Sequence, residues 1–321
     1  MPPRPKWFRS DEVVISNAPT CGINKDGHEQ YVVDPVTGIR STVIDDKLFD
    51  DAKRVKQGDL KSPYLAVCKL DEVYKRKVGS PNYFDRTTIR AFESFVKGLK
   101  NFTSSSLAEL REEGLLEINY GHGSPSSDQR LGDVPYIKVS DLRAGHVNIN
   151  PTNMIPVALA EKFWGGPSSG VKPYDLISPE RASKNIGDFC VLMPGQDRIV
   201  LTKEVLVVRA STTAPFDQFY LMWALTLREV RAQWKRVILM QTNREDVGNR
   251  AFEIQIPVPK NRKTADEVSK HFRDYYQRLE AARQTFATSL RESPYKHHVF
   301  LETAKPLDEE EEGSESEEMT S

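Results

Sequence analysis

The sequence of 321 residues lacks the motifs by which common enzyme classes are recognised. It has no glycine-rich phosphate loop, because the stretch Gly121-His-Gly123 is too short to count as one. It also has no His-Glu-x-x-His helix, no Cys-x-x-Cys pair and no Gly-x-Ser-x-Gly elbow. We therefore interpret the chain as a protein that recognises a target rather than an enzyme that converts one.

Cysteine is scarce, and long apolar runs are missing. Cys21, Cys68 and Cys190 are isolated and odd in number, which favours reduced thiols in a cytoplasmic protein over a disulfide framework or a zinc site. No run of about 18 apolar residues is present to cross a membrane. The N-terminal stretch Met1–Phe8 has no apolar segment of the kind found in secretory signals. The pair His297-His298 is interpreted as exposed rather than metal-binding.

Net positive charge is also lacking, since 45 basic residues stand against 46 acidic ones. The acids are unevenly spread, and residues 308–318 hold eight of them with no base. A block of like charge is typical of a disordered tail. Without it the rest of the chain has a net charge of +7. Such a moderately basic body permits a DNA-binding face without requiring one.

Residues 1–60 have the pattern of a small module. Turn-forming clusters at Gly22–Gly27 and Asp34–Gly38 flank a strand-like stretch, Glu29–Val33, which predicts a short β-hairpin. Residues Asp45–Val55 follow as a short helix, because acids at its start suit the helix dipole.

Residues 61–132 mix helical and strand signals. Apolar spacing predicts a helix over Thr88–Leu99, and serines ahead of Leu107 predict the capped start of another that ends at Gly114. Residues Leu115–Tyr120 are strand-like. The polar stretch Gly121–Gly132 that follows is a loop of a length that usually has a function or is disordered.

Short strands and one long helix are predicted next. The helix covers Pro215–Leu239, where Phe219, Trp223 and Trp234 keep helical spacing and are interpreted as core residues. A last strand, Phe252–Ile256, leads into Pro257 and Pro259, which cannot extend a central ladder. The segment Trp164–Tyr174 is either a recognition loop or a flexible insertion. The shorter predicted strands are Pro135–Val139, Phe189–Met193, Ile199–Leu201 and Val205–Arg209.

A final helix is predicted from Thr264, which can cap it, to about Arg291, and Pro294 ends it. Its apolar residues are spaced like a heptad repeat, which predicts a coiled-coil partner. The expected partner-binding residues are Phe272, Tyr275, Leu279, Ala282 and Phe286.

One enzymatic alternative stays open. A metal-dependent nuclease needs clustered carboxylates and a lysine, and Asp188, Glu204 and Lys203 are the residues that could supply them. Asp188 lies in a Gly-Asp turn between strands, which makes it a poor metal ligand. A third reading is an assembly protein that does not read DNA.

Four stretches in order resemble the target-recognition domain of specificity (S) subunits in Type I restriction–modification systems. Residues Val134–Val147 resemble the opening of that domain after its glycine-rich loop. Ile186–Leu192 is similar to the Gly-Asp strand of that domain. Val205–Arg209, together with the helix after it, is similar to the strand–helix step of that domain. Gly248–Pro259 is similar to its closing strand and Ile-Pro-Val-Pro signature. The resemblance covers roughly residues 107–290.

A second resemblance lies upstream. Residues Cys21–Tyr31, with Asp45–Leu48 later, are similar to the segment just after the catalytic domain of adenine-N6 DNA methyltransferases. The catalytic Asn/Asp-Pro-Pro-Tyr/Phe motif of that family is absent from this chain. The resemblance therefore implies the specificity half of a split methyltransferase, with S-adenosylmethionine bound by the catalytic partner chain and no cofactor in this one.

Residues that could read DNA are expected in three regions, because Arg suits guanine and Asn or Gln suits adenine, while Lys, Arg and Ser contact phosphates. The first region is the loop Ser124–Arg130, the second flanks the first strand, and the third joins the long helix to the last strand. The expected DNA-binding residues are Ser126, Ser127, Gln129, Arg130, Lys138, Arg143, Gln241, Asn243, Arg244, Asn249 and Arg250.

The sequence thus predicts an α/β (mixed α+β) fold with a twisted recognition-domain sheet and a long C-terminal helix. The expected function is a non-catalytic, sequence-specific DNA-recognition subunit of a restriction–modification or related phage-defence system, without membrane association. Its expected partners are double-stranded DNA, an adenine-N6 methyltransferase subunit, and a second copy of itself or a restriction subunit. The predicted parts are a module at 1–60, a recognition domain at 61–262, a coiled-coil-like helix at 263–295 and a disordered acidic tail at 296–321.

Overall fold

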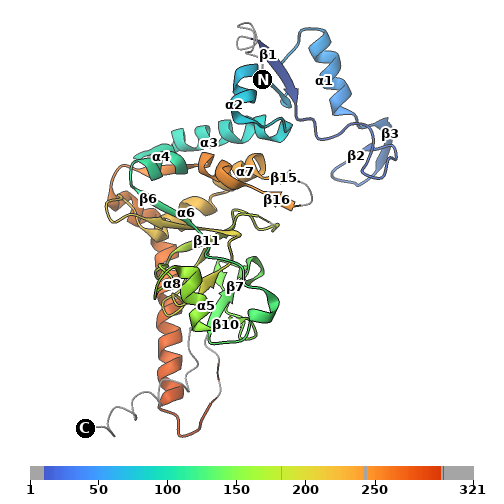
Figure 1. The fold of residues 1–321 in the computed structure, drawn as a ribbon. Helices are drawn as coiled ribbons and strands as arrows, with labels where there is room; N and C mark the ends of the chain where they lie inside the picture. The colour runs from blue at the N-terminus through green and yellow to red at the C-terminus, as the bar shows by residue number, and fades with distance from the viewer. Residues whose placement is uncertain (1–10, 182, 242–243, 298, 300–321) are drawn as a thin grey trace, which may run out of the picture. The chain divides into compact units, whose positions relative to one another are not determined.

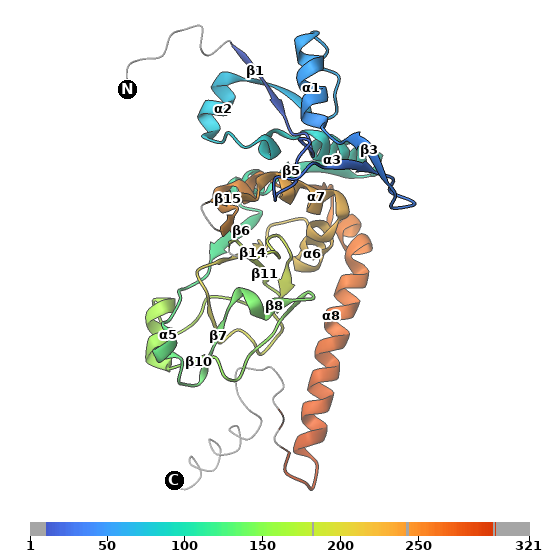
Figure 2. The ribbon, with the colours of Figure 1, turned by 90° about the vertical axis from the view of Figure 1, so that its right-hand side faces the viewer.

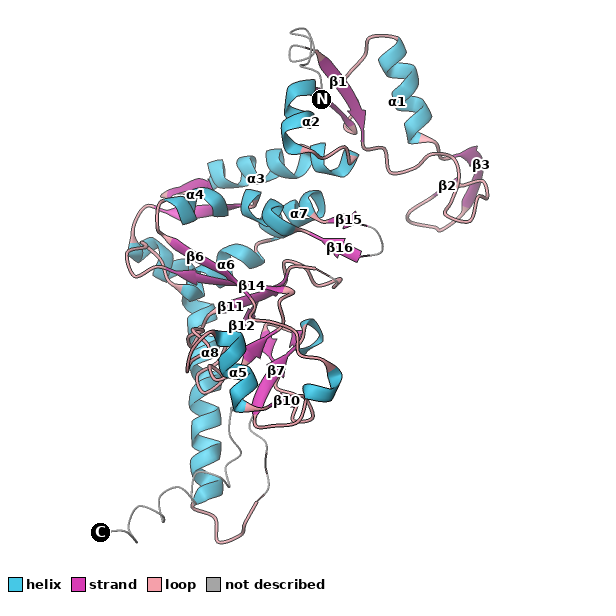
Figure 3. Ribbon diagram, viewed as in Figure 1, coloured by secondary structure: helices cyan, strands magenta, loops and turns pink. Residues whose placement is uncertain are grey.

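The computed structural model describes residues 11–181, 183–241, 244–297 and 299. The chain divides into two compact units, and Figures 1 and 3 show their elements. Unit 1 comprises residues 1–95 with Lys235–Val237, and unit 2 comprises residues 96–234 and 238–321. The first unit thus extends beyond the predicted module of residues 1–60. The predicted acidic tail lies almost wholly outside the described residues.

Unit 1 is built on an antiparallel pair, β1 with β4, in which Glu12 pairs with Lys69 and Ser16 with Leu65. Its small core contains Cys68, Tyr83 and Phe84, against which half-buried apolar side chains pack. Its elements are β1 (Glu12–Ser16), β2 (Tyr31–Val33), β3 (Arg40–Ile44), α1 (Lys47–Lys56), β4 (Leu65–Lys69), α2 (Leu70–Arg76), η2 (Pro81–Phe84) and most of α3 (Thr87–Gly98).

The hairpin and helix predicted near the N-terminus are confirmed. The β2–β3 turn forms because the Asp34 carboxylate accepts hydrogen bonds from the amides of Val36 (2.8 Å) and Thr37 (2.9 Å). These two bonds hold the pKa of Asp34 below its usual value. Helix α1 begins at Lys47 because the Asp46 side chain caps it by accepting from the Phe49 amide at 2.8 Å.

Unit 2 contains two main sheets joined by shared core residues, and two further two-stranded ladders, β15–β16 and β17–β5. The larger has the strand order β6-β14-β11-β12-β9-β8, and the smaller has the order β10-β7-β13. The strands are β5 (Phe102–Ser106), β6 (Leu116–Tyr120), β7 (Val134–Ile137), β8 (Leu142–Arg143), β9 (His146–Val147), β10 (Met154–Ile155), β11 (Leu176–Pro179), β12 (Cys190–Val191), β13 (Val200–Leu201), β14 (Val205–Ala210), β15 (Leu239–Gln241), β16 (Arg244–Asp246) and β17 (Gln255–Pro259). Its short helices are α4 (Leu107–Glu112), η3 (Ser127–Gln129), η4 (Val139–Asp141), α5 (Val157–Trp164), α6 (Gln218–Thr226), α7 (Arg228–Val237, of which the last three residues belong to unit 1) and η5 (Gly248–Glu253).

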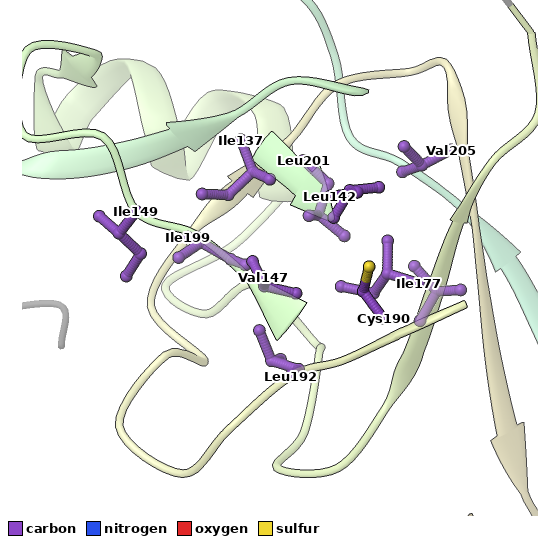
Figure 4. Close-up of a cluster of buried hydrophobic side chains, with 11 residues drawn as sticks. Ile137, Leu142, Val147, Ile149, Ile177, Cys190, Leu192, Ile199, Leu201 and Val205 are labelled. Carbon is purple, nitrogen blue, oxygen red and sulfur yellow. The ribbon is translucent and has the colours of Figure 1, made fainter. Parts of the chain in front are cut away.

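The main core of unit 2 is formed by aliphatic side chains from both sheets, and Figure 4 shows them pointing toward one another. Ile137 and Leu201 enter it from the smaller sheet, and Ile177 and Val207 enter from the larger one. Burying each such side chain stabilises the fold by ~1.5–3 kcal/mol. Because both sheets contribute to one core, the loops that leave their strands start from fixed positions.

The prediction of one long helix over Pro215–Leu239 is wrong, because the segment forms two helices, α6 and α7, with a break at Leu227. Leu227 has an extended backbone (φ −56°, ψ 137°), and the Thr226 hydroxyl donates to the carbonyl of Met222 at 2.7 Å. Neither glycine nor proline marks the break. The interpretation of the aromatic stripe as core is confirmed for Phe219 and Trp234, which are 7% and 1% exposed.

The predicted last strand begins too early, since Gly248–Glu253 is a 3₁₀ helix and β17 starts at Gln255. Pro257 and Pro259 lie inside β17 and pair with β5 at Ser104 and Phe102. They are tolerated because this ladder has two strands, so both are edges.

The C-terminal helix is confirmed as α8 (Arg262–Arg291). Its cap is Asn261, whose side chain accepts from the amide of Thr264 at 2.9 Å, so the predicted cap at Thr264 is wrong by three residues. The first half of α8 packs on α6, and Figure 2 shows the rest of α8 extending past the sheets of unit 2. Arg262 and Arg273 both pair with Asp217, the residue that caps α6 (2.8 and 2.7 Å). These ion pairs hold the two helices in register. The mixed α/β class with a long C-terminal helix is therefore confirmed.

Candidate nucleic-acid interface

The glycine-rich loop between β6 and β7 is held against the core at its start. A Cβ atom on Gly121 would lie 1.8 Å from the Thr202 carbonyl oxygen, and one on Gly123 would lie 2.2 Å from Cδ1 of Phe163. Only glycine permits backbone to approach so closely. These glycines, which do not form a phosphate loop, therefore fix the point from which the loop leaves the sheet.

His122, between those glycines, joins three segments of unit 2. Its Nδ1 accepts from the amide of Leu201 at 2.9 Å, so the proton of the neutral ring is on Nε2, which donates to the carbonyl of Ser169 at 2.8 Å. Burial lowers the pKa of His122, and the bond to Ser169 opposes that effect. The imidazole thus links this loop to β13 and to the Trp164–Tyr174 segment. No sequence pattern indicated this role beyond a histidine between two glycines.

The tip of the loop presents polar side chains to solvent. Ser126, Ser127 and Gln129 are exposed, and the Ser126 amide donates to Oε1 of Gln129 at 3.2 Å. The half-buried Arg130 donates to the carbonyl of Pro125 at 3.3 Å, and its guanidinium lies 5.3 Å from the centre of the Tyr136 ring. The first predicted region therefore forms a short ordered turn whose hydrogen-bonding groups face outward.

The second predicted region lies elsewhere on the sheet. Lys138 follows β7 and is half-buried, and its amide donates to the Asp141 carboxylate at 2.8 Å. Arg143 is exposed on β8, and its Nε donates to the carbonyl of Ser140 at 2.8 Å. Because β6 and β8 are the opposite edge strands of the six-stranded sheet, Arg143 is not brought together with the glycine-rich loop that follows β6.

The third predicted region is partly described. Gln241 and Arg244 pair through their backbones in the β15–β16 hairpin. Asn243 lies outside the described residues, as do the side chains of Gln241 and Arg244. Asn249 is exposed at the start of η5, whereas Arg250 is half-buried and donates to the carbonyl of Asp246 at 2.9 Å.

The start of the glycine-rich loop and the third region meet at one end of the six-stranded sheet. Tyr120, the last residue of β6, donates from its hydroxyl to Oδ1 of Asn249 at 3.3 Å. The amide of Val247 donates to the carbonyl of Glu180 at the end of β11 (3.2 Å), which attaches the β15–β16 hairpin to the same end of the sheet. Tyr120 is the second residue that the sequence patterns missed. It is 44% exposed beside two of the predicted DNA-contacting regions.

Charge is unevenly placed at this end of the sheet. Glu180 is 3% exposed, and burial raises its pKa, with Asp246 adding to the rise and Arg181 opposing it. The Arg181 guanidinium lies 3.5 Å from the Glu180 carboxylate. Glu180 is therefore below the surface. The exposed side chains of the loop tip and of η5 are the neutral Ser126, Ser127, Gln129 and Asn249, together with one acid, Asp128.

The carboxylates considered for nuclease chemistry do not form a metal site. Asp188 pairs with Arg231 at 2.7 Å and borders a pocket of about 410 Å³ that Arg143 also lines. Glu204 belongs to the turn between β13 and β14, where its carbonyl accepts from the amide of Glu180 at 2.8 Å. Within the described part of the chain, no group of three His, Cys, Asp or Glu side chains could hold a metal ion. None of its helices is long and apolar enough to span a bilayer.

No protein-family model matches the chain, and no curated protein does. Among solved structures, the chain is similar to the S subunit of a Type-I restriction–modification system from M. genitalium, at 12% identity over 61% of this chain and 45% of that one, with a TM-score of 0.38. It is also similar to the HsdS subunit from Thermoanaerobacter tengcongensis, at 14% identity over 74% and 49% of the two chains, with a TM-score of 0.36. A third similar structure is the type IIG restriction endonuclease BpuSI, at 9% identity over 70% and 33%, with a TM-score of 0.42.

The chain spans about half the length of the S subunits to which it is similar. At these identities the similarity concerns the fold. Solved S subunits are thus among the structures that this chain resembles, as the four ordered sequence stretches predicted.

Proposed function

We propose that this chain is a DNA-specificity subunit that directs a partner adenine-N6 methyltransferase to its sites. The observation that carries the proposal is the ordered series of stretches between Val134 and Pro259, which lie in unit 2 except for Lys235–Val237. Delegating sequence reading suits base methylation, because an enzyme that extrudes its target base leaves the flanking bases for another domain to read.

The end of the sheet formed by β6, β14 and β11 is the proposed reading surface. Asn249 is joined there to Tyr120, the residue that precedes the glycine-rich loop. Asn249 and the loop tip offer the exposed donors and acceptors that base edges require. The anchored glycines and His122 hold the loop in place before DNA arrives, so less conformational entropy is lost on binding. Arg143, at the other edge of the sheet, is proposed as a separate backbone contact.

Catalysis is assigned to the partner chain, which would bind S-adenosylmethionine. The C-terminal half of α8 is proposed to attach that partner or a second copy. Tyr275 and Phe286 are 52% and 49% exposed, Ala282 is exposed, and Phe272 and Leu279 are half-buried. The first half of the predicted heptad stripe is used within the chain, since the Tyr275 hydroxyl lies 3.0 Å from Nε2 of His146. The neighbouring Tyr276 packs against Phe219 of α6 (ring centres 6.5 Å apart). Membership of a phage-defence system belongs to the same proposal.

The decisive measurement is DNA binding by the chain together with its methyltransferase, as a function of salt. The double variant Arg130→Ala/Asn249→Ala should bind the cognate duplex about 10- to 100-fold more weakly, because two contacts to bases or phosphates are removed. Lys162→Ala, an exposed lysine of α5 outside the three regions, is the matched control and should leave affinity nearly unchanged.

Three outcomes would contradict the proposal. Equal affinity of the double variant and wild type would remove this end of the sheet from the interface. A complex that discriminates no DNA sequence at any salt concentration would reject the specificity role and favour an assembly protein instead. Cleavage of DNA by the purified chain alone would favour a nuclease, and Asp188→Ala would then identify the residue responsible.

A further inference from the structure

Residues 23–50 form an ordered part of unit 1 that has no core. Within this described stretch, which holds β2, β3 and the start of α1, no residue is buried. A hairpin of two strands is at best marginally stable alone in water, and it needs a third strand or a packed helix to cover its apolar face. The segment thus lacks the cover that such hairpins require.

Hydrogen bonds, rather than apolar burial, hold this segment together. The amide of Gly22 donates to the carbonyl of Asp45 (3.1 Å), and the amide of Asp45 donates to the carbonyl of Gln30 (2.8 Å). The amide of Leu48 donates to the carbonyl of Thr20 (3.0 Å). These bonds tie the hairpin to the first turn of α1. They leave its apolar side chains exposed or at most half-buried.

The exposed apolar side chains of β2, β3, their turn and the start of α1 are here named the hairpin–helix surface. Exposed fractions are 37% for Val32, 51% for Val33, 91% for Val36, 68% for Ile39, 62% for Val43, 46% for Ile44, 46% for Leu48 and 55% for Phe49. Scattered exposed apolar residues are normal, whereas a contiguous group of them marks an interaction site. Their concentration in one short segment favours a binding surface.

The charge around this surface excludes DNA as its ligand. Between Asp11 and Leu60 there are ten acidic and six basic residues. Two of the bases are turned onto neighbouring rings, since the Arg40 guanidinium lies 4.0 Å from the ring centre of Tyr31 and the Lys53 ammonium 4.2 Å from that of Phe49. A net acidic surface repels phosphates. An acidic rim around apolar side chains fits a protein instead.

We infer that the hairpin–helix surface docks the catalytic methyltransferase chain through an apolar patch with a basic rim on that partner. A second copy of this chain fits less well, because a symmetric pairing would set acidic rim against acidic rim. The inference rests on the proposed function for the identity of the partner. It adds a docking site in unit 1 to the attachment proposed for α8 in unit 2.

The test uses the full-length chain and the purified adenine-N6 methyltransferase chain from the same organism, titrated by calorimetry. Val43→Asp and Phe49→Asp should each weaken binding at least about 30-fold, because a charge replaces an apolar contact in the interface. The matched control is Leu60→Asp, an apolar residue of unit 1 that is 42% exposed and lies outside the surface. Its affinity should stay within about twofold of wild type.

A second readout needs no substitution. Cys21 is exposed beside the hairpin, whereas Cys68 and Cys190 are buried and serve as internal references. Adding the methyltransferase chain should slow alkylation of Cys21 at least about fivefold, because a docked protein excludes the reagent from the interface. This readout is independent of whether the aspartate variants fold.

The outcomes separate this inference from the proposed function. If wild type and both aspartate variants bind equally and Cys21 stays reactive, the docking surface is wrong while the specificity role stands. If the complex forms and depends on Val43 but recognises no DNA sequence, the docking holds and the specificity role fails. If Val43→Asp instead abolishes self-association and no methyltransferase binds, a second copy is the occupant and the inference is overturned.

Discussion

The histidine that anchors the glycine-rich loop gives the sharpest test of the candidate interface. His122→Ala removes two hydrogen bonds, each contributing ~0.5–1.5 kcal/mol net, and leaves the amide of the fully buried Leu201 without its acceptor, at a cost of ~1–3 kcal/mol. The expected loss of stability is therefore ~2–4 kcal/mol. DNA affinity should fall as well, because the loop loses its fixed start.

The assay is urea unfolding followed by tryptophan fluorescence. Three of the four tryptophans, Trp164, Trp223 and Trp234, lie in unit 2, so the signal reports mainly on the unit that holds His122. The exposed His28 of unit 1 supplies the control, and His28→Ala should change stability by less than about 0.5 kcal/mol.

The dependence on pH tests the assigned tautomer. Burial lowers the pKa of His122, so the folded state favours the neutral ring. The contribution of His122 to stability should therefore be fully present above the unfolded pKa of about 6.5 and be lost as pH falls through the lower folded pKa. The difference between wild type and His122→Ala should thus shrink from about pH 7.5 to about pH 5, because other titrating groups cancel in the difference. A difference that is absent, or constant over this range, would refute the argument.

Three further outcomes are expected. Asp175 is fully buried and paired with Arg209 through two bonds (2.7 and 2.5 Å). Asp175→Ala should cost ~3–5 kcal/mol in urea unfolding, because the half-buried guanidinium loses its buried partner and keeps only Glu117 and the Gly170 carbonyl. Burial raises the pKa of Cys190 to about 12, which disfavours the reactive thiolate. In native protein a maleimide should therefore modify the exposed Cys21 and leave Cys190 unreacted until denaturant is added, and mass spectrometry measures both. Gly121→Ala places a Cβ where the Thr202 carbonyl lies, and calorimetry should show a lower unfolding temperature with weaker DNA binding, whereas a wild-type melt would contradict the close approach.

Local chemistry explains which elements could be read from the sequence. Helix α1, the β2–β3 hairpin and α4 were predicted correctly because their signals lie within a few residues: the Asp46 cap, the Asp34 turn, and the capping box of Ser106 with Glu109. The α6–α7 break could not be predicted, because the apolar spacing continues across Leu227.

The candidate site likewise combines features that the sequence predicted with features that depend on the fold. The sequence predicted that polar residues of the loop and of η5 belong to one function, but the pairing of Tyr120 with Asn249 depends on strand order in the sheet. The same strand order places Arg143 at the opposite edge, although it is close to the loop in sequence. The DNA contacts of all these residues stay predictions.

By itself, the sequence determined the class of the fold, the acidic block near the C-terminus and the order of the recognition-domain stretches, because composition and short-range patterns encode them. Only the tertiary structure decided that His122 joins three segments of unit 2, and that residues 23–50 are ordered without a core. Both features depend on contacts, or on a lack of burial, between residues far apart in the chain. No local pattern records them.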